Sequence, residues 1–106
     1  MYDDFSDRLL ISCKKDSDKI KGSIRVLNLI LDFNSNNKLV NIELKKASEY
    51  LKSLKINPSI LNNLTNAEIV SRQCRDGLLI YFLLQNKNII EKIPYNIYSQ
   101  KPVLLN

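Results

Sequence analysis

The sequence contains no histidine. Histidine is the commonest general base and the commonest transition-metal ligand, so its absence excludes most hydrolytic mechanisms. Glycine is also scarce, because Gly22 and Gly77 are the only two and each stands alone in a predicted turn. The chain therefore has no glycine-rich phosphate loop. We predict that the protein is not an enzyme and that it uses no cofactor and no metal.

Cysteine and long apolar runs are equally rare. Cys13 and Cys74 lie far apart and outside any CxxC motif, which favours reduced, half-buried thiols over a disulfide framework or a zinc site. The longest apolar runs, 29–31 and 78–84, are much shorter than the roughly 20 residues that cross a bilayer. The N-terminus begins with acidic residues and does not resemble a secretory signal. We expect a cytoplasmic protein that does not enter a membrane.

The remaining composition is that of an ordinary globular protein. The chain has 106 residues, of which 44% are hydrophobic and 25% charged. This length supports one hydrophobic core but not two. We therefore predict a single α+β domain over residues 1–106, ordered except for a few residues at each end.

The net charge of +5 raises the question of nucleic-acid binding. Residues 1–53 carry ten basic and eight acidic groups, and residues 54–106 carry six and three, so neither half is a basic arm. In the densest basic cluster, acidic residues interrupt the lysines: Lys14, Lys15, Asp16, Asp18, Lys19 and Lys21. This mixture weakens the field at a phosphate backbone and favours a solvated loop. Weak, non-specific nucleic-acid binding is kept as an alternative function.

The first half of the chain has the pattern of antiparallel strands. Apolar residues alternate with a period of two over 8–13, which predicts a first strand. After a polar loop, 23–33 is again rich in β-forming residues and is interpreted as one strand, bent near Asn28. The asparagine-rich segment 34–37 should close a hairpin onto a third strand over 38–43.

Two helical segments follow these strands. Apolar residues recur at helical spacing at Leu44, Ala47, Leu51 and Leu54, which predicts an amphipathic helix. Asn57 and Pro58 then have the positions of an N-cap and a first-turn proline, so a short second helix is expected over 58–64.

A second set of antiparallel strands is predicted after the helices. Residues 67–73 are interpreted as a strand, with a helical turn as the alternative, and 74–77 form a strong turn. The most apolar segment, 78–84, should be a strand that is buried on both faces. Residues 89–93 can return antiparallel to it, and Pro94 should end the ladder because proline lacks a backbone donor.

A set of residues in the first half resembles a known family pattern. They are Tyr2-Asp3, Asp7, Leu9, Ile11, Leu31-Asp32, Leu39-Val40-Asn41-Ile42-Glu43-Leu44 and Ala47-Ser48. This pattern, over residues 2–51, is similar to the family called domain of unknown function 2283. The resemblance implies a three-stranded antiparallel meander followed by a helix over 1–55, with 56–106 as an extension that adds further strands.

The resemblance also bears on one residue and on function. The family pattern usually has glycine at the position of Asn41, and asparagine tolerates left-handed backbone geometry, so a turn or bulge there is expected to survive. The family implies no activity and no catalytic residues. Some relatives are thought to be encoded beside small toxin-like proteins, which implies an antitoxin-like binding role.

Carboxylates offer two candidate sites. Asp3, Asp4 and Asp7 could together bind a hard cation, but chain termini are usually mobile, and a solvated N-terminus is the favoured interpretation. Asp32 and Glu43 lie near opposite ends of the predicted first hairpin and could approach across strands. We interpret them as a surface pair and not as a catalytic dyad.

Cysteine and tyrosine offer further candidates. Cys74 lies next to Arg75, but without a histidine partner it is interpreted as inert. A carboxylate- or cysteine-based enzyme is kept as a third hypothesis. The tyrosines at positions 50, 81, 95 and 98 could stack on nucleic-acid bases, yet their spacing favours packing in a core or an interface. The apolar stretch 95–105 should cover the sheet or contact a partner.

The strands at 27–31 and 78–84 are apolar on both sides, whereas one main helix covers only part of one side. Another chain is the natural cover for the remainder, since symmetric dimers are the commonest oligomers. We therefore predict a homodimeric protein-interaction module, possibly of the antitoxin-like kind that the resemblance implies. The interface candidates are Leu27, Leu29, Leu31, Leu79, Tyr81 and Leu83.

Overall fold

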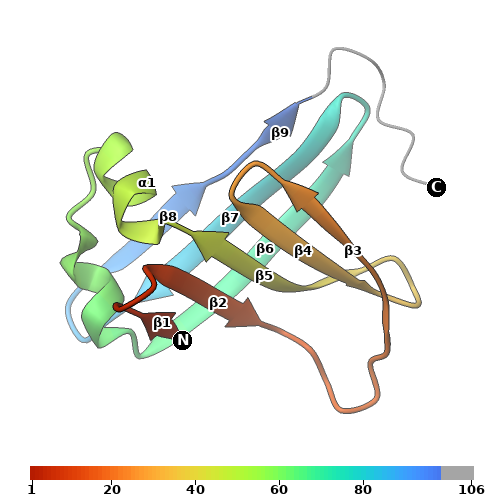
Figure 1. The fold of residues 1–106 in the computed structure, drawn as a ribbon, viewed down its shortest axis with the longest axis horizontal. Coiled ribbons are helices and arrows are strands. Elements are labelled where there is room, and N and C mark those ends of the chain that lie inside the picture. Colours follow the sequence, from red (N-terminus) through yellow and green to blue (C-terminus); the bar gives the residue numbers. More distant parts are fainter. Residues whose placement is uncertain (99–106) are drawn as a thin grey trace.

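The computed structural model describes residues 1–98, and Figure 1 shows the course of the chain. The strands are β1 (Tyr2–Asp3), β2 (Arg8–Ser12), β3 (Ile20–Val26), β4 (Leu29–Asn34), β5 (Leu39–Lys45), β6 (Asn66–Cys74), β7 (Gly77–Gln85), β8 (Ile90–Pro94) and β9 (Ile97–Tyr98). The helices are α1 (Ala47–Ser53) and the 3-10 helix η1 (Pro58–Asn63). The predicted α+β class, with antiparallel strands before and after the helices, is confirmed.

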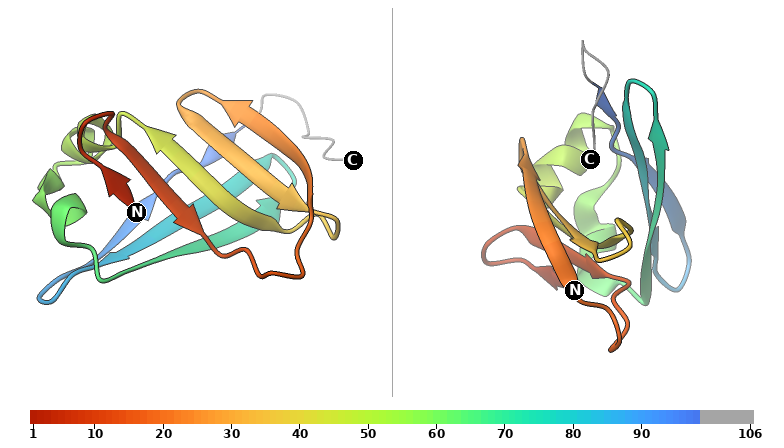
Figure 2. Two further views of the ribbon diagram at one scale, coloured as in Figure 1. Left: turned by 60° about the horizontal axis from the view of Figure 1, so that its bottom comes forward. Right: turned by 90° about the vertical axis from the view of Figure 1, so that its right-hand side faces the viewer.

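The strands form two sheets that face each other. The first sheet has the order β1-β2-β5-β4-β3. In the second sheet β6 and β8 flank β7, and β9 continues beside β7 beyond β8. Figure 2 shows the two sheets as separate layers, with α1 and η1 at one end of the stack. Each sheet therefore covers one face of the other, as in a β-sandwich.

One hydrophobic core lies between the two sheets. Every second residue of β7 is fully buried at Ile80, Phe82 and Leu84, because side chains alternate between the two faces of a strand. Leu9 on β2 and Leu51 on α1 belong to the same core. Each such side chain contributes about 1.5–3 kcal/mol by leaving water, so both sheets and both helices depend on one another.

The first helix begins later than the sequence indicated, and the second begins where it was expected. The pairing of Arg8 with Lys45 keeps Leu44 in β5, so α1 starts at Ala47 and is shorter than predicted. The predicted second helix is confirmed as η1. Its Asn57 side chain accepts a hydrogen bond from the Ser59 amide at 2.9 Å, as its capping position predicted.

The interpretation of 23–33 as one bent strand is wrong. The segment contains the end of β3, a turn at Leu27 and Asn28, and β4. Leu27 has a φ of 53° there, a geometry that glycine and asparagine usually provide in hairpin turns. The meander therefore consists of β3, β4 and β5, and the first predicted strand, β2, joins the free side of β5.

The second half follows the prediction with two corrections. Strands β6, β7 and β8 pair as expected. The ladder does not end at Pro94, because the Tyr95 amide donates to the carbonyl of Ile80 at 2.8 Å and β9 then resumes the pairing. Strand β7 is buried on one face and only half-buried on the other, so the prediction of two buried faces is wrong.

The N-terminus is ordered, contrary to the expectation of a loose end. The terminal amine of Met1 donates to the carbonyl of Leu10 at 2.7 Å, and the Leu10 amide donates back to Met1 at 2.7 Å. The outer part of the predicted apolar C-terminal stretch, 99–105, lies outside the described residues. In the part of the chain that the structure describes, no helix is long and apolar enough to cross a membrane.

Candidate functional site

The outward face of the second sheet carries a row of apolar side chains. Leu79, Tyr81 and Leu83 alternate along β7 with the buried core residues and are half-buried on the opposite face. The neighbouring strands extend the row sideways. Val70 on β6 lies opposite Tyr81, and Ile90 on β8 lies opposite Gln85, diagonally from Leu83. Val70 is 47% exposed and Ile90 is 68% exposed. We call Val70, Leu79, Tyr81, Leu83 and Ile90 the outer apolar patch.

Charged side chains surround this patch. Glu68 and Lys92 lie opposite Leu83 on either side, and Arg72 lies opposite Leu79. The ammonium nitrogen of Lys92 is 4.2 Å from the centroid of the Tyr81 ring, a cation–π contact that holds the ring in place. An aromatic and aliphatic centre with a charged rim is the composition of a protein interface.

The structure divides the six predicted interface residues into two groups. Leu79, Tyr81 and Leu83 belong to the outer apolar patch, and Leu27 is 85% exposed at the turn between β3 and β4. Leu29 and Leu31 are at most 1% exposed, because they face the second sheet of the same chain. Their interpretation as interface residues is wrong for this reason.

The sequence interpretation missed Val70 and Ile90. A signal for Val70 is visible in the sequence, since it follows Ile69, a partly buried residue that packs against the core. Neighbouring residues of a strand point to opposite faces, so Val70 must point outward. Ile90 has no comparable signal, because its face depends on the register of β8 against β7.

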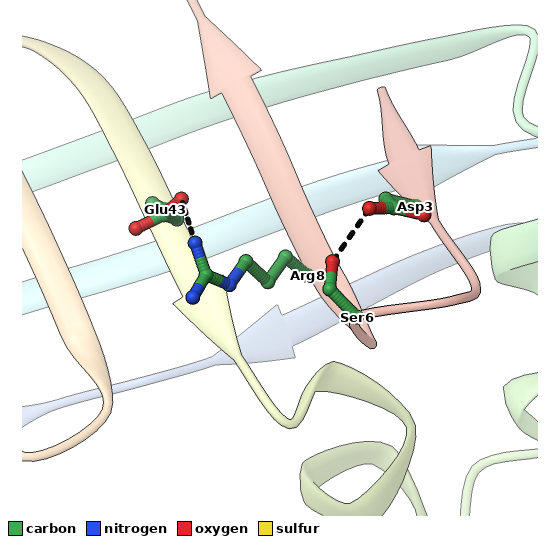
Figure 3. A network of polar contacts seen from close by, with 4 residues as sticks. All are labelled: Asp3, Ser6, Arg8 and Glu43. Atoms are coloured by element: carbon green, nitrogen blue, oxygen red, sulfur yellow. Dashed lines mark hydrogen bonds and ion pairs between the residues drawn. The ribbon is translucent and has the colours of Figure 1, made fainter.

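The N-terminal carboxylates do not form a cation site. Asp3 accepts hydrogen bonds from the Ser6 hydroxyl at 2.6 Å and from the Phe5 amide at 3.1 Å, which closes the turn after β1 (Figure 3). These two bonds are the main reason that the pKa of Asp3 is below its ordinary value. Among residues 1–98, no group of three or more acidic, cysteine or histidine side chains could hold a metal ion.

Asp7 instead joins the N-terminus to helix α1. Its carboxylate accepts from the Tyr2 hydroxyl at 2.6 Å, the Ser48 hydroxyl at 2.7 Å and the Ser48 amide at 2.9 Å. Lys46 provides no side-chain cap for α1, so Asp7 satisfies that helix terminus from a distant part of the chain.

The same contacts change the acidity of both partners. Burial alone raises the pKa of Asp7, but the hydrogen bonds from Tyr2 and Ser48 outweigh it and leave the pKa below its ordinary value. Burial, together with the bond to the Asp7 carboxylate, raises the pKa of Tyr2 to about 12. Asp7 therefore has a structural role as a charged helix cap, and its oxygens are already occupied.

A row of polar side chains crosses the outward face of the first sheet. The Ser12 hydroxyl donates to the Asn41 side-chain oxygen at 2.6 Å, and the Asn41 amide donates to Asp32 at 3.2 Å. The Ser23 hydroxyl donates to the other oxygen of Asp32 at 2.6 Å. This polar row joins four neighbouring strands, from β2 through β5 and β4 to β3.

Two predictions about this face need correction. Asn41 is not among the described residues with positive φ, so its side chain, and not a left-handed backbone, explains its place in the structure. A bulge is present beside it, where the register shifts between Asp32 and Phe33. Asp32 and Glu43 do not act as a pair, because Glu43 lies 3.6 Å from the Arg8 guanidinium (Figure 3).

An open groove of about 750 Å³ lies where the first sheet meets the start of β6. Its lining includes Tyr2, Leu10, Leu61, Asn66 and Asp32. Asp32 is the only carboxylate in this lining, as far as the described residues show, and both of its oxygens accept the hydrogen bonds described above. The groove therefore has mixed polarity, and Asp32 is the one side chain in the described lining that is charged near neutral pH.

The remaining candidates are dispersed. Cys13 is exposed and Cys74 is half-buried, and both are free thiols. The prediction of a half-buried thiol is therefore wrong for Cys13. The predicted lysine loop is exposed, and Asp18 closes it by accepting from the Lys15 amide at 2.8 Å.

The tyrosines fall into different surroundings. Tyr50 and Tyr95 pack together with ring centroids 4.8 Å apart, and burial raises the pKa of each. The hydroxyl of Tyr50 donates to the carbonyl of Pro94. Tyr81 lies in the outer apolar patch, whereas the side chain of Tyr98 is outside the part that the structure describes. The rings of Tyr50, Tyr81 and Tyr95 do not form one stacking platform, because Tyr95 lies in the core and Tyr81 lies on the outward face of the second sheet.

Comparisons with protein-family models, with curated proteins and with solved structures found no match to this chain. Function is therefore inferred from the chemistry of the surface. Of the surfaces described above, the outer apolar patch has the composition that is least favourable in water.

Proposed function

We propose that this protein acts without catalysis, as a homodimeric protein-interaction module whose second sheet carries the contact surface. The observation that supports this is the outer apolar patch, which places an aromatic ring and four aliphatic side chains on a solvent-facing sheet. Contiguous apolar surface of this kind usually marks a site of protein contact. Tyrosine is also among the residues that contribute most at interfaces.

The contrast between the two outward sheet faces supports the same proposal. The first sheet has the polar row of Ser12, Asn41, Asp32 and Ser23 on its outward face, which water solvates well. The second sheet has apolar residues at the equivalent, central positions of its outward face. Within residues 1–98, each sheet thus covers the inward face of the other, and the outward face of the second sheet is the one with apolar residues at its centre.

The resemblance to domain of unknown function 2283 supports a finer proposal. Some members of that family are thought to be encoded beside small toxin-like proteins, so the patch would bind a small protein of that kind. A binding role of this type needs no ionisable site, which agrees with the dispersed carboxylates and thiols. In this proposal the protein stays in the cytoplasm and does not act on nucleic acid.

Light scattering coupled to size-exclusion chromatography tests the proposal. At micromolar concentration we expect a mass twice that of the 12.3 kDa chain. Val70→Lys should shift the protein toward the monomer, because it places two like charges in the patch. Leu10→Lys is a matched control, since Leu10 is 46% exposed on the outward face of the first sheet and Val70 is 47% exposed. A wild-type monomer at this concentration contradicts the proposal.

A further inference from the structure

The outward face of the second sheet is open in the part of the chain that the structure describes. Figure 2 shows the first sheet on the inward side, and no segment of residues 1–98 lies over the outward side of β6, β7 and β8. The free edge of β6 is less accessible, because strands β2 and β5 of the first sheet contact β6. A partner that covers the outer apolar patch therefore approaches from the outward side.

The size of this face suits a second copy of the same sheet. Strands β6 and β7 have nine residues each and β8 has five. With about 3.3 Å per residue and about 4.8 Å between strands, the face measures about 30 Å by about 14 Å. Two such faces in contact bury on the order of 1,000 Å² in total, which is typical of a reversible protein complex. Face-to-face packing of two sheets is also the usual arrangement in a sandwich.

The charges at the rim of the patch have both signs, so the patch can face a copy of itself. Glu68 on β6 and Lys92 on β8 flank Leu83 at the same level of the sheet. A two-fold axis that runs along β7, between two stacked copies, places β6 of each copy over β8 of the other. Glu68 of each copy then faces Lys92 of the other. Val70 likewise faces Pro94, because these two residues share one level of the sheet.

An axis that runs across the strands at Tyr81 is the alternative. It would place β6 over β6, so that Glu68 would face Arg72 of the other copy. Lys92 would then be covered with no carboxylate opposite it, although its ammonium group lies over the Tyr81 ring in the patch. Covering a charge without a partner is unfavourable. The axis along β7 avoids this cost, because it places a carboxylate opposite Lys92.

We propose that two copies of this chain stack through the outward faces of their second sheets, about a two-fold axis that runs along β7. This inference rests on the proposed homodimer and specifies how its two copies meet. The dimer is then a stack of four sheets, in which the outer apolar patch of each copy covers that of the other. A small protein that binds the same patch has to displace one copy, so self-association and partner binding compete.

Charge exchange between Glu68 and Lys92 tests the contact. Glu68→Lys and Lys92→Glu should each raise the dimer dissociation constant about tenfold, because each creates two like-charged pairs across the interface. The double exchange should restore the wild-type constant, and circular dichroism checks that each variant is folded. Arg72→Glu is the matched control, since Arg72 lies on the same strand and face as Glu68 but opposite no charge of the other copy. It should leave the constant almost unchanged.

Small-angle X-ray scattering gives an independent measurement of the shape of the dimer. One copy measures 39 × 35 × 23 Å, and its shortest direction runs through the two sheets (Figure 1). Stacking through the second sheets doubles only this dimension, so the dimer should be about as thick as it is long. A contact between sheet edges would nearly double one of the longer dimensions, and such an elongated dimer overturns the inference.

The outcomes separate this inference from the homodimer on which it rests. Rescue of Glu68→Lys by Lys92→Glu, in a compact dimer, supports the stacked arrangement. Rescue of Glu68→Lys by Arg72→Glu instead means that the axis runs across the strands, which overturns the inference. A dimer that ignores every exchange also overturns it but leaves the homodimer intact. A wild-type monomer in light scattering excludes the homodimer itself, so the two failures are distinct.

Discussion

The hydroxyl of Tyr95 donates a hydrogen bond of 2.6 Å to the side-chain oxygen of Asn28, a residue 67 positions earlier in the chain. Asn28 lies in the β3–β4 turn of the first sheet, and Tyr95 lies between β8 and β9 of the second. The Asn28 side chain also donates to the carbonyl of Lys45 at 2.7 Å. One amide group therefore links the two layers and the end of β5.

Replacing Tyr95 with phenylalanine should lower the free energy of unfolding by about 1–2 kcal/mol, because a partly buried oxygen of Asn28 loses its donor. Urea unfolding followed by circular dichroism measures this change. Tyr81→Phe is the control, since the hydroxyl of Tyr81 makes no hydrogen bond within the described part of the chain. Equal effects of both substitutions would contradict a specific role for the Asn28 contact.

The position of Leu29 in the core gives a second prediction. Leu29→Ala should cost about 2–5 kcal/mol of unfolding free energy, because the side chain is fully buried and its removal leaves a cavity. Leu27→Ala, two residues earlier at an exposed turn, should change stability by less than about 0.5 kcal/mol. Denaturant titration of both variants distinguishes a core leucine from an exposed one, and a small effect at Leu29 would contradict the observed packing.

The Asp7 cap should make stability depend on pH. The pKa of Asp7 in the folded protein is below its ordinary value of 3.8, so its ionised form contributes stability above that value. The contribution is lost as the pH falls through the folded pKa. Asp7→Asn should therefore cost about 1 kcal/mol near neutral pH, and this cost should shrink as the pH falls through the folded pKa of Asp7.

Unfolding free energies of wild type and Asp7→Asn, measured from neutral pH down to pH 2, test this dependence. Asp16→Asn is a control because Asp16 is exposed in the loop between β2 and β3. The difference in unfolding free energy between wild type and Asp16→Asn should stay small at every pH in this range. If the difference in unfolding free energy between wild type and Asp7→Asn does not change with pH, the charge of the Asp7 cap does not contribute to stability.

Substitutions of Asn41 can distinguish the contribution of its side chain from that of its backbone conformation. Its φ is not positive, and it lies inside β5. Asn41→Gly should therefore be less stable than Asn41→Ala by about 0.5–1 kcal/mol, because glycine loses more backbone entropy in a strand. Thermal unfolding of Asn41→Gly and Asn41→Ala measures this difference in stability. A more stable glycine variant would mean that the position favours left-handed geometry.

Local patterns predicted much of the fold. The β-branched and aromatic residues of 78–84, with turn residues on either side, indicated β7 correctly. The asparagine-rich turn and the Asn57–Pro58 cap also appear where they were expected. The β3–β4 hairpin was missed because its turn contains Leu27 with positive φ, for which the sequence has no glycine signal. The hydrogen bonds of Asn28 to Tyr95 and to Lys45 hold that turn in place.

The candidate surface could be predicted only in part. Leu29 and Leu79 lie in equally apolar segments, and both were expected at an interface. One is buried and the other is half-buried on the outward face. Their difference depends on which sheet face meets the other sheet, a contact between residues far apart in sequence. Periodicity defines two faces for each strand, but it does not indicate which face another layer covers.

The strand order of the first sheet also has a consequence for how the chain folds. Strand β2 pairs with β5, so its backbone partners follow it by 29 to 37 positions, whereas β3, β4 and β5 form consecutive hairpins. Hairpins close within microseconds, and distant pairings form more slowly because a long loop must be closed first. As the chain leaves the ribosome, β2 has only the two-residue strand β1 beside it until β5 has emerged. The earliest nucleus should therefore be the β3–β4–β5 hairpins, and β2 should attach to a sheet that already exists.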